Sequence, residues 1–355
     1  MGEACFTPAR HHHSRRAAAG AVQRQTEKRD ASASLARDGI GSPSYILLYH
    51  PDRRVAERAV AQCVAEIERL EQAFSLYRDD SEIVRLNCHG YLEAPSHDLL
   101  ALLSECQSFS ELSGGAFDVT VQPLWNVYAA HFFGSASPSP QGPEPRAIAE
   151  ALALVDWQGV DIAFRRISLA RPGMGLTLNG IAQGYLTDRI ADILRVNGCD
   201  RVLADMGRSE ILLVGCRPDG QAWRIALTDP LASERVAVTL ELADRCISTS
   251  GGYGTKFEAT GRHHHLFDPM TGASAGHYIA VSVVAVSAMV ADALSNSTLR
   301  DADGMQRAVA RGLSGCPGPG DPSRRIAASA GRVISSRRWG EGERDSAGRT
   351  LSNCR

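Results

Sequence analysis

The sequence predicts an α+β fold. Apolar residues recur every three or four positions in several segments, which indicates helices, and short runs rich in β-branched and aromatic residues indicate strands. These strands do not alternate with the helices as a regular βαβ repeat requires. The chain has 355 residues, of which 44% are apolar, and is therefore long enough to bury one large core or two smaller ones.

The N-terminal residues 1–38 are predicted to be a disordered segment, because they are rich in Arg, Ala and Ser and show no periodic apolar face. Arg15 and Arg16 precede a short apolar run, as in a twin-arginine export signal, but polar residues at 23–25 end that run early. The sequence as written shows no clean signal peptide, so we expect a cytoplasmic location.

Order is expected to begin with a strand in the run "GSPSYILLYH", which Pro51 closes. The apolar period then changes from that of a strand to that of a helix. One long helix is predicted, and its buried stripe consists of Val55, Ala59, Cys63, Ile67, Leu70 and Phe74.

A second helix is predicted in "SHDLLALLSECQSFSELSGG", with Ser96 as its N-cap and Gly114 where it stops. Its buried side is expected to carry Leu99, Leu103, Cys106 and Phe109. The following "GSASPSPQGPEP" is predicted to be an exposed loop, because Pro, Ser and Gly hold neither helix nor strand.

The second half of the chain is predicted to contain short strands and a helix over about 181–197, which ends at Gly198. The strands are expected near residues 201–205, 211–215, 223–227, 236–240 and 278–285.

Composition excludes several classes of partner and site. A net charge of −2 provides no field that would attract nucleic acid or an anionic membrane. No Cys-x-x-Cys pair occurs among the nine cysteines, so a zinc knuckle is not supported. No run approaches the ~20 apolar residues that a membrane span needs.

Four stretches contain glycines and polar residues that are not typical of a hydrophobic core. They are "SGGAFDVTVQPLW", "GMGLTLNGIAQGYLTDRI", "STSGGYGTKFE" and "SAMVADALSNST". Each has an ordinary structural interpretation: Asp118 as a cap, Gly180 as a turn residue, the third stretch as a hairpin turn, and Asp292 as a solvated helix charge. Together the four stretches indicate a more specific role than these separate structural interpretations.

Six ordered motifs between residues 41 and 298 resemble the ApbE family of FAD:protein FMN transferases. They are "YRDDSEIVRLN", "GGAFDVTVQPLWNVY", "NGIAQGYLTDRIADIL", "STSGGYGTKFE", "HHLFDPMTG" and "ADALSNS". The resemblance implies an ApbE-like fold of two packed α/β subdomains with mostly antiparallel sheets and a site for FAD and metal in the cleft between them. It implies a transferase domain over residues 39–299.

The activity implied by the resemblance is a magnesium-dependent transfer. The enzyme would cleave FAD, attach FMN through a phosphoester bond to a Thr or Ser of an acceptor protein, and release AMP. The acceptor would be a flavoprotein, such as a redox-complex subunit or an electron carrier, and family members are often periplasmic or membrane-anchored. Two alternatives stay open: a FAD-binding module with little turnover, and a metal-dependent FAD pyrophosphatase that yields FMN and AMP.

Magnesium prefers hard oxygen ligands and can neutralise a pyrophosphate while polarising its phosphorus. Asp292 provides a full negative charge, and residues three and four positions later on a helix share its face, which places Ser295 and Asn296 beside it. By resemblance, these three residues and the backbone carbonyl of Gly180 are the metal-binding positions.

The resemblance also implies a set of cofactor-binding residues. Tyr77 and Phe267 have an alternative interpretation as core residues. The full set is Tyr77, Ala116, Phe117, Asp118, Thr177, Gln183 and Phe267.

His265, two residues before Phe267 and three before "DP", matches the family's histidine and is the predicted general base for an acceptor hydroxyl. Zinc binding by the three consecutive histidines is the alternative. In an extended segment, however, His264 points to the opposite face from His263 and His265, so the three would not converge on one ion.

The chain departs from the commonest family pattern at Thr177, Gln183, Ser295 and Asn296, where Asp, Lys, an acidic or small residue, and Thr are usual. Gln183 and Asn296 keep polar groups that can contact a ligand. Residues 300–355 are predicted to be a degenerate tail with a terminal strand near 331–339, because Arg, Gly and Ser dominate there.

Overall fold

The computed structural model describes residues 32–39, 42–207, 209–300 and 330–337. Its centre is a seven-stranded sheet with the order β1-β2-β6-β7-β10-β11-β12, in which every pair of neighbours is antiparallel. The strands are β1 (Ser32–Gly39), β2 (Ser42–Tyr49), β6 (Val202–Met206), β7 (Glu210–Val214), β10 (Arg245–Gly251), β11 (Tyr278–Ala285) and β12 (Ala330–Arg337).

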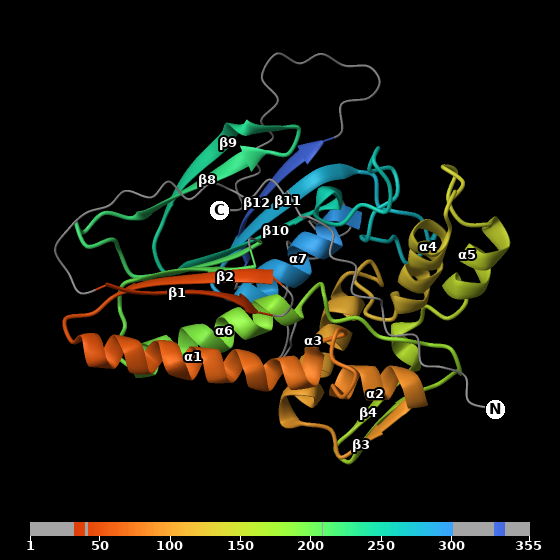
Figure 1. Ribbon diagram of the computed structural model, residues 1–355, viewed down its shortest axis with the longest axis horizontal. Helices are drawn as coiled ribbons and strands as arrows, with labels where there is room; N and C mark the ends of the chain where they lie inside the picture. The colour runs from red at the N-terminus through yellow and green to blue at the C-terminus, as the bar shows by residue number, and fades with distance from the viewer. Residues whose placement is uncertain (1–31, 40–41, 208, 301–329, 338–355) are drawn as a thin grey trace, which may run out of the picture.

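Three helices cover one face of this sheet, as Figure 1 shows: α1 (Arg53–Phe74), α6 (Ala182–Val196) and α7 (Ala288–Arg300). Apolar side chains from these helices and from the sheet form the main core. A hairpin of β8 (Trp223–Asp229) and β9 (Ala232–Leu242) covers part of the other face, where Trp223 and Leu240 join a second core cluster with sheet residues. The sheet is therefore buried on both faces near its centre.

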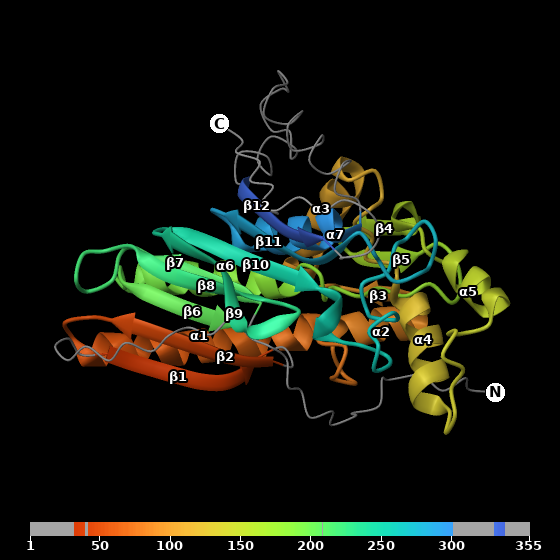
Figure 2. The same ribbon diagram turned by 90° about the horizontal axis from the view of Figure 1, so that it is seen from above.

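A second group of elements lies beyond one end of the large sheet in both views (Figures 1 and 2). It includes a three-stranded antiparallel sheet of order β3-β5-β4. Its elements are α2 (Glu82–His89), β3 (Tyr91–Glu93), α3 (His97–Leu112), α4 (Gln122–Gly134), α5 (Pro145–Leu152), β4 (Val160–Ala163) and β5 (Arg166–Leu169).

The predicted helices are confirmed, and local chemistry explains their bounds. The Asp52 side chain accepts from the amide of Arg54 at the start of α1, and Ser96 caps α3 by accepting from Leu99. The periodic stripe of α1 is buried except for Val55, which is only partly buried because the stripe begins one residue later, at Ala56.

Two segments differ from the sequence predictions. The predicted disordered segment 1–38 extends too far, because residues 32–38 belong to β1 and pair with β2; residues 1–31 lie outside the described residues. The stretch "STSGG" is not simply a turn either. It ends β10, which pairs with β7 and β11, and the turn follows as a short 3₁₀ helix at Gly252–Gly254.

The predicted strands of the second half are confirmed, with ends that shift by a few residues. The terminal strand is confirmed as β12, which pairs with β11. The rest of the predicted tail, at 301–329 and 338–355, lies outside the described residues. Within the described part of the chain, no helix combines the length and the apolar character that crossing a membrane would require.

Candidate active site

Helices α6 and α7 approach each other closely at Gly184. A Cβ atom at this position would lie 2.5 Å from the carbonyl oxygen of Ala288 and 2.6 Å from the Cα of Met289, so only glycine allows this contact. The backbone N–H of Gly184 thereby donates to Oδ2 of Asp292 at 3.0 Å. The second glycine of the "NGIAQGY" motif, Gly184, therefore positions Asp292, the principal acidic residue of the site.

One turn later on α6, Asp188 holds the first turn of α7. Its carboxylate accepts from the amides of Ala288 (2.7 Å) and Met289 (3.1 Å) and from the Ser287 hydroxyl (2.6 Å). These groups are among those that a helix N-terminus leaves without intrahelical partners. Asp188 thus fixes where α7 begins and, with Gly184, how α7 is turned against α6.

Asp292 is almost completely buried, with 3% of its surface exposed. Burial raises the pKa of its carboxyl group to about 7, although the hydrogen bonds from Gly184 and Asn296 act in the opposite direction. Both of these donors are neutral. A buried carboxylate held only by neutral donors remains costly, and a bound cation would remove that cost.

Asn296 connects Asp292 to the turn before α6. Its side-chain Nδ2 lies 3.1 Å from Oδ1 and 3.1 Å from the backbone oxygen of Asp292, and 3.3 Å from the carbonyl oxygen of Gly180. The structure thus brings Gly180 close to Asp292 and Asn296, although Gly180 lies more than 100 residues earlier in the chain. These oxygens are of the hard type that magnesium binds.

Ser295 belongs to a buried hydroxyl network that connects α7 to the sheet. Its Oγ donates to the backbone oxygen of Asp292 at 2.9 Å and lies 2.7 Å from Oγ of Ser250 and 3.3 Å from Oγ of Ser248. Ser248 in turn donates to Glu210 at 3.1 Å. The Ser295 hydroxyl therefore connects helix α7 to strand β10.

Glu210 is the residue that sequence reasoning missed. It is 3% exposed, and its pKa is raised well above the ordinary value by burial and then by the nearby charge of Asp292. The available signal was an acidic residue at the start of the apolar run "EILLV", together with serines at alternate positions of "ISTSG". Nothing in the sequence indicated that these segments would meet α7.

His265 lies in the segment that returns after η2 (Gly252–Gly254). Its backbone amide donates to the carbonyl of Thr255 at 3.2 Å, and its ring Nδ1 lies 3.1 Å from the same oxygen. A carbonyl oxygen can only accept, so Nδ1 carries a proton, and in the neutral ring the lone pair is on Nε2. This tautomer is the one that a general base needs at Nε2.

The other two histidines of the run have different surroundings. His264 is buried, its Nε2 lies 2.9 Å from the carbonyl oxygen of Ala275, and its ring fills the space beside Gly252. His263 packs against the rings of Tyr128 and Phe132, and burial lowers its pKa. Across the described residues, no group of three or more His, Cys, Asp or Glu side chains could hold a metal ion, so the zinc alternative gains no support.

Two of the predicted cofactor-binding residues, Asp118 and Phe267, have buried partners within the fold. The carboxylate of Asp118 is buried and accepts from the amide and hydroxyl of Thr120 and from the amide of Trp157. The ring of Phe267 is 1% exposed and lies 4.9 Å from the ring of Tyr128, centre to centre. Both side chains therefore have partners within the fold, and their contact with a flavin stays a prediction.

The remaining predicted cofactor-binding residues lie on several elements. Tyr77 is 40% exposed, whereas Ala116 and Phe117 are buried. Thr177 is partly buried, and its amide donates to the carbonyl of Val119 at 2.8 Å. Gln183 donates through Nε2 to the carbonyl of Met206 at 2.7 Å, which ties α6 to β6. Their contact with a flavin stays a prediction.

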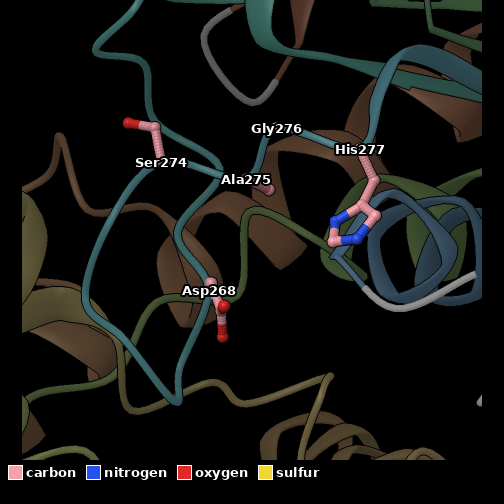
Figure 3. Close-up of a pocket in the computed structure, with 5 residues that line it drawn as sticks. All are labelled: Asp268, Ser274, Ala275, Gly276 and His277. Carbon is pink, nitrogen blue, oxygen red and sulfur yellow. The ribbon is translucent and has the colours of Figure 1, made fainter. Parts of the chain in front are cut away.

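A surface pocket adjoins the segment that carries His265. Figure 3 shows the residues that line it, with the side chains of Asp268 and His277 extending in the same direction from either side of the chain at Ala275 and Gly276. The fifth residue, Ser274, exchanges hydrogen bonds with the backbone of His264. The pocket is therefore built on the same folded loop as the predicted base.

Comparison with known proteins is consistent with this geometry. Residues 41–311 match the ApbE family. A FAD:protein FMN transferase of Vibrio cholerae is 33% identical over 238 residues, which cover 66% of this chain and 70% of that protein. A FAD:protein FMN transferase of Treponema pallidum is 31% identical over 263 residues, with coverages of 67% and 70%.

Solved structures agree. The flavin transferase ApbE from Vibrio cholerae aligns with a TM-score of 0.69 at 26% identity, covering 86% of this chain and 94% of that one. The ApbE protein of Thermotoga maritima, at 24% identity and a TM-score of 0.73, shows the same fold. Fold and similarity together define an enzyme of the flavin transferase class. The chain belongs to the ApbE family, and the predicted α+β fold is confirmed.

Proposed function

We propose that this protein is a magnesium-dependent FAD:protein FMN transferase. The observation that carries the proposal is the convergence of the Gly180 carbonyl with the buried Asp292 carboxylate across the α6–α7 contact. The match to the ApbE family, at residues 41–311, spans both residues.

The donor set fits magnesium. Asp292, the backbone oxygen of Gly180, the hydroxyl of Ser295 and the amide oxygen of Asn296 would hold the ion, and all four donors are oxygens. When bound, magnesium supplies positive charge that neutralises a pyrophosphate and makes its phosphorus easier to attack. A carboxyl group that is buried without a cationic donor suits this purpose, since the ion would replace the missing counter-charge.

His265 would accept the proton of the acceptor hydroxyl at Nε2, the ring nitrogen that does not face Thr255. The hydroxyl oxygen of a Thr or Ser forms a new ester bond to the FMN phosphorus, and the bond from that phosphorus to the bridging oxygen breaks. AMP leaves with the bridging oxygen. The acceptor is a protein with a Thr or Ser that becomes flavinylated.

The test is incubation of the protein with FAD, Mg²⁺ and a candidate acceptor protein, with AMP measured by chromatography and FMN attachment by intact mass. The expected result is one AMP released for each FMN attached, and none in EDTA. AMP with free FMN and no attachment would instead identify a pyrophosphatase. Tight FAD binding without AMP would identify a binding module, and either result would overturn the proposal.

A further inference from the structure

We infer that the side-chain amide of Asn296 stands in for the cation when no metal is bound, and that it turns over to present its oxygen when the metal binds. The inference rests on the metal site of the proposed function and deepens it. Asn296 would thus set the metal affinity in two ways. Its NH₂ group competes with the ion, and its amide oxygen binds the ion.

The first step of the argument is the chemistry of the three neighbouring atoms. Oδ1 of Asp292, the backbone oxygen of Asp292 and the carbonyl oxygen of Gly180 are acceptors only, and all lie 3.1–3.3 Å from Nδ2 of Asn296. Only the NH₂ end of the amide can face three acceptors favourably, because the oxygen end would repel them. The partial positive charge of the NH₂ group therefore occupies the position where oxygens converge.

The second step is the rigidity of the surroundings. Asn296 is 6% exposed, and the helix that carries it is fixed to α6 by Gly184 and Asp188. A Cβ at Gly180 would lie only 3.2 Å from Cγ of Asn296, so the turn at Gly180 packs closely against the amide of Asn296. These contacts restrain the oxygens, and rotation about the terminal torsion of Asn296, which has broad two-fold preferences, is the response that we infer.

The third step compares Asn with Thr, which would offer the metal a hydroxyl oxygen in place of the amide. A Thr hydroxyl has a single hydrogen and cannot satisfy three acceptors, so a chain with Thr leaves them underpaired until a cation arrives. The Asn amide has two hydrogens, so it satisfies two of the three acceptors in advance. Metal binding must then break these hydrogen bonds, so Asn at this position lowers metal affinity and stabilises the metal-free protein.

The experiment measures metal binding without FAD and without turnover. Full-length protein and the variant Asn296→Thr are titrated with Mn²⁺ followed by electron paramagnetic resonance and with Mg²⁺ by calorimetry, and melting temperatures are recorded with and without metal. Ser297→Ala is the matched control, because Ser297 is a buried residue of the same helix whose hydroxyl bonds only to the Ala293 carbonyl among the hydrogen bonds described.

The expected result for Asn296→Thr is a lower melting temperature without metal, a larger rise on adding metal, and metal binding tightened about 10-fold, the equivalent of ~1.4 kcal/mol. Ser297→Ala should bind metal as the parent does. Asn296→Ala, which removes both ends of the amide, should lose stability without gaining as much affinity as Asn296→Thr.

A direct readout is the side-chain NH₂ signal of Asn296 in a ¹H–¹⁵N spectrum, identified by its absence in Asn296→Thr. Its hydrogen exchange should be slow without metal and faster with metal. This inference would be overturned if the parent binds metal and Asn296→Thr binds it with the same affinity, or if the NH₂ group stays protected with metal bound. Either result would leave the proposed function intact. No metal binding by the parent would overturn both.

Discussion

The tautomer of His265 is set by one backbone oxygen, and this makes its role testable at the scale of a single residue. With Nδ1 facing Thr255, the lone pair lies on Nε2. We predict that His265→Ala lowers the rate of FMN transfer by about 10²–10⁴-fold and changes FAD affinity little, because the residue moves a proton and does not hold the cofactor. Single-turnover kinetics and FAD titration measure the two effects separately.

His89 provides the matched control for this prediction. Its Nδ1 also lies against a backbone oxygen, that of Arg85 at 2.8 Å, but on the exposed end of α2. His89→Ala should leave the transfer rate unchanged. His264→Ala should instead lower the melting temperature, since it removes a buried bond to Ala275. A His265→Ala variant that transfers FMN at the parent rate would exclude His265 as the base.

At the scale of elements, the contact between α6 and α7 depends on a glycine. We predict that Gly184→Ala separates the helices, costs about 1–3 kcal/mol of stability and weakens metal binding, because its Cβ would overlap the backbone at Ala288 and Met289. Chemical denaturation and Mn²⁺ titration measure both effects.

The control is Gly134→Ala in α4, where a Cβ would have no atom within 4 Å. Because Ala favours helix more than Gly does, this change should be neutral or slightly stabilising. Equal stability of the two variants would show that the close approach of α6 and α7 does not constrain the site.

At the scale of the whole molecule, an ion-pair network connects three helices. Glu66 of α1 binds Arg69 through two hydrogen bonds and also binds Arg189 of α6, while Arg69 reaches Asp98 of α3. The hydrogen bonds from Arg69 and then from Arg189 lower the pKa of Glu66. The network therefore ties the helical layer to the second group of elements.

The pH dependence follows from the sign of this shift. A carboxyl group with a lowered pKa in the folded state contributes stability above its unfolded pKa of about 4.3, and the contribution is lost as the pH falls through the lower folded value. We predict that Glu66→Gln costs about 1 kcal/mol at pH 7 and progressively less below pH ~4. Urea unfolding at several pH values measures this difference.

Glu57→Gln on the same helix is the control. Its pair with Arg53 is exposed, at 55% and 79% of the side-chain surface, so the change should have little effect at any pH. A Glu66 variant that behaves like the Glu57 variant would show that the network does not support the fold.

Helices α1, α3 and α6 could be predicted from the sequence because their signals are local, whereas α2, α4 and α5 were not predicted. The period of α1 and the Ser96 cap of α3 depend on residues within a few positions of each other. Strand β1 was missed because its "SASLARDG" has no apolar alternation, and pairing with β2 determines its conformation. Strand β10 was missed in the same way, since its serines and glycine indicate a turn.

Ordered motifs and helical spacing were enough to predict the family and the fold class and to select Asp292, Asn296 and His265 as candidates, because both are properties of the chain alone. The contacts between distant segments, in contrast, came from the packing of the folded chain. It placed Gly180 against Asn296, brought Glu210 into the network of Ser295, and buried Phe267 among aromatic rings. The physical reason is that burial and hydrogen bonding between distant segments depend on how the helices pack on the sheet, which no local pattern encodes.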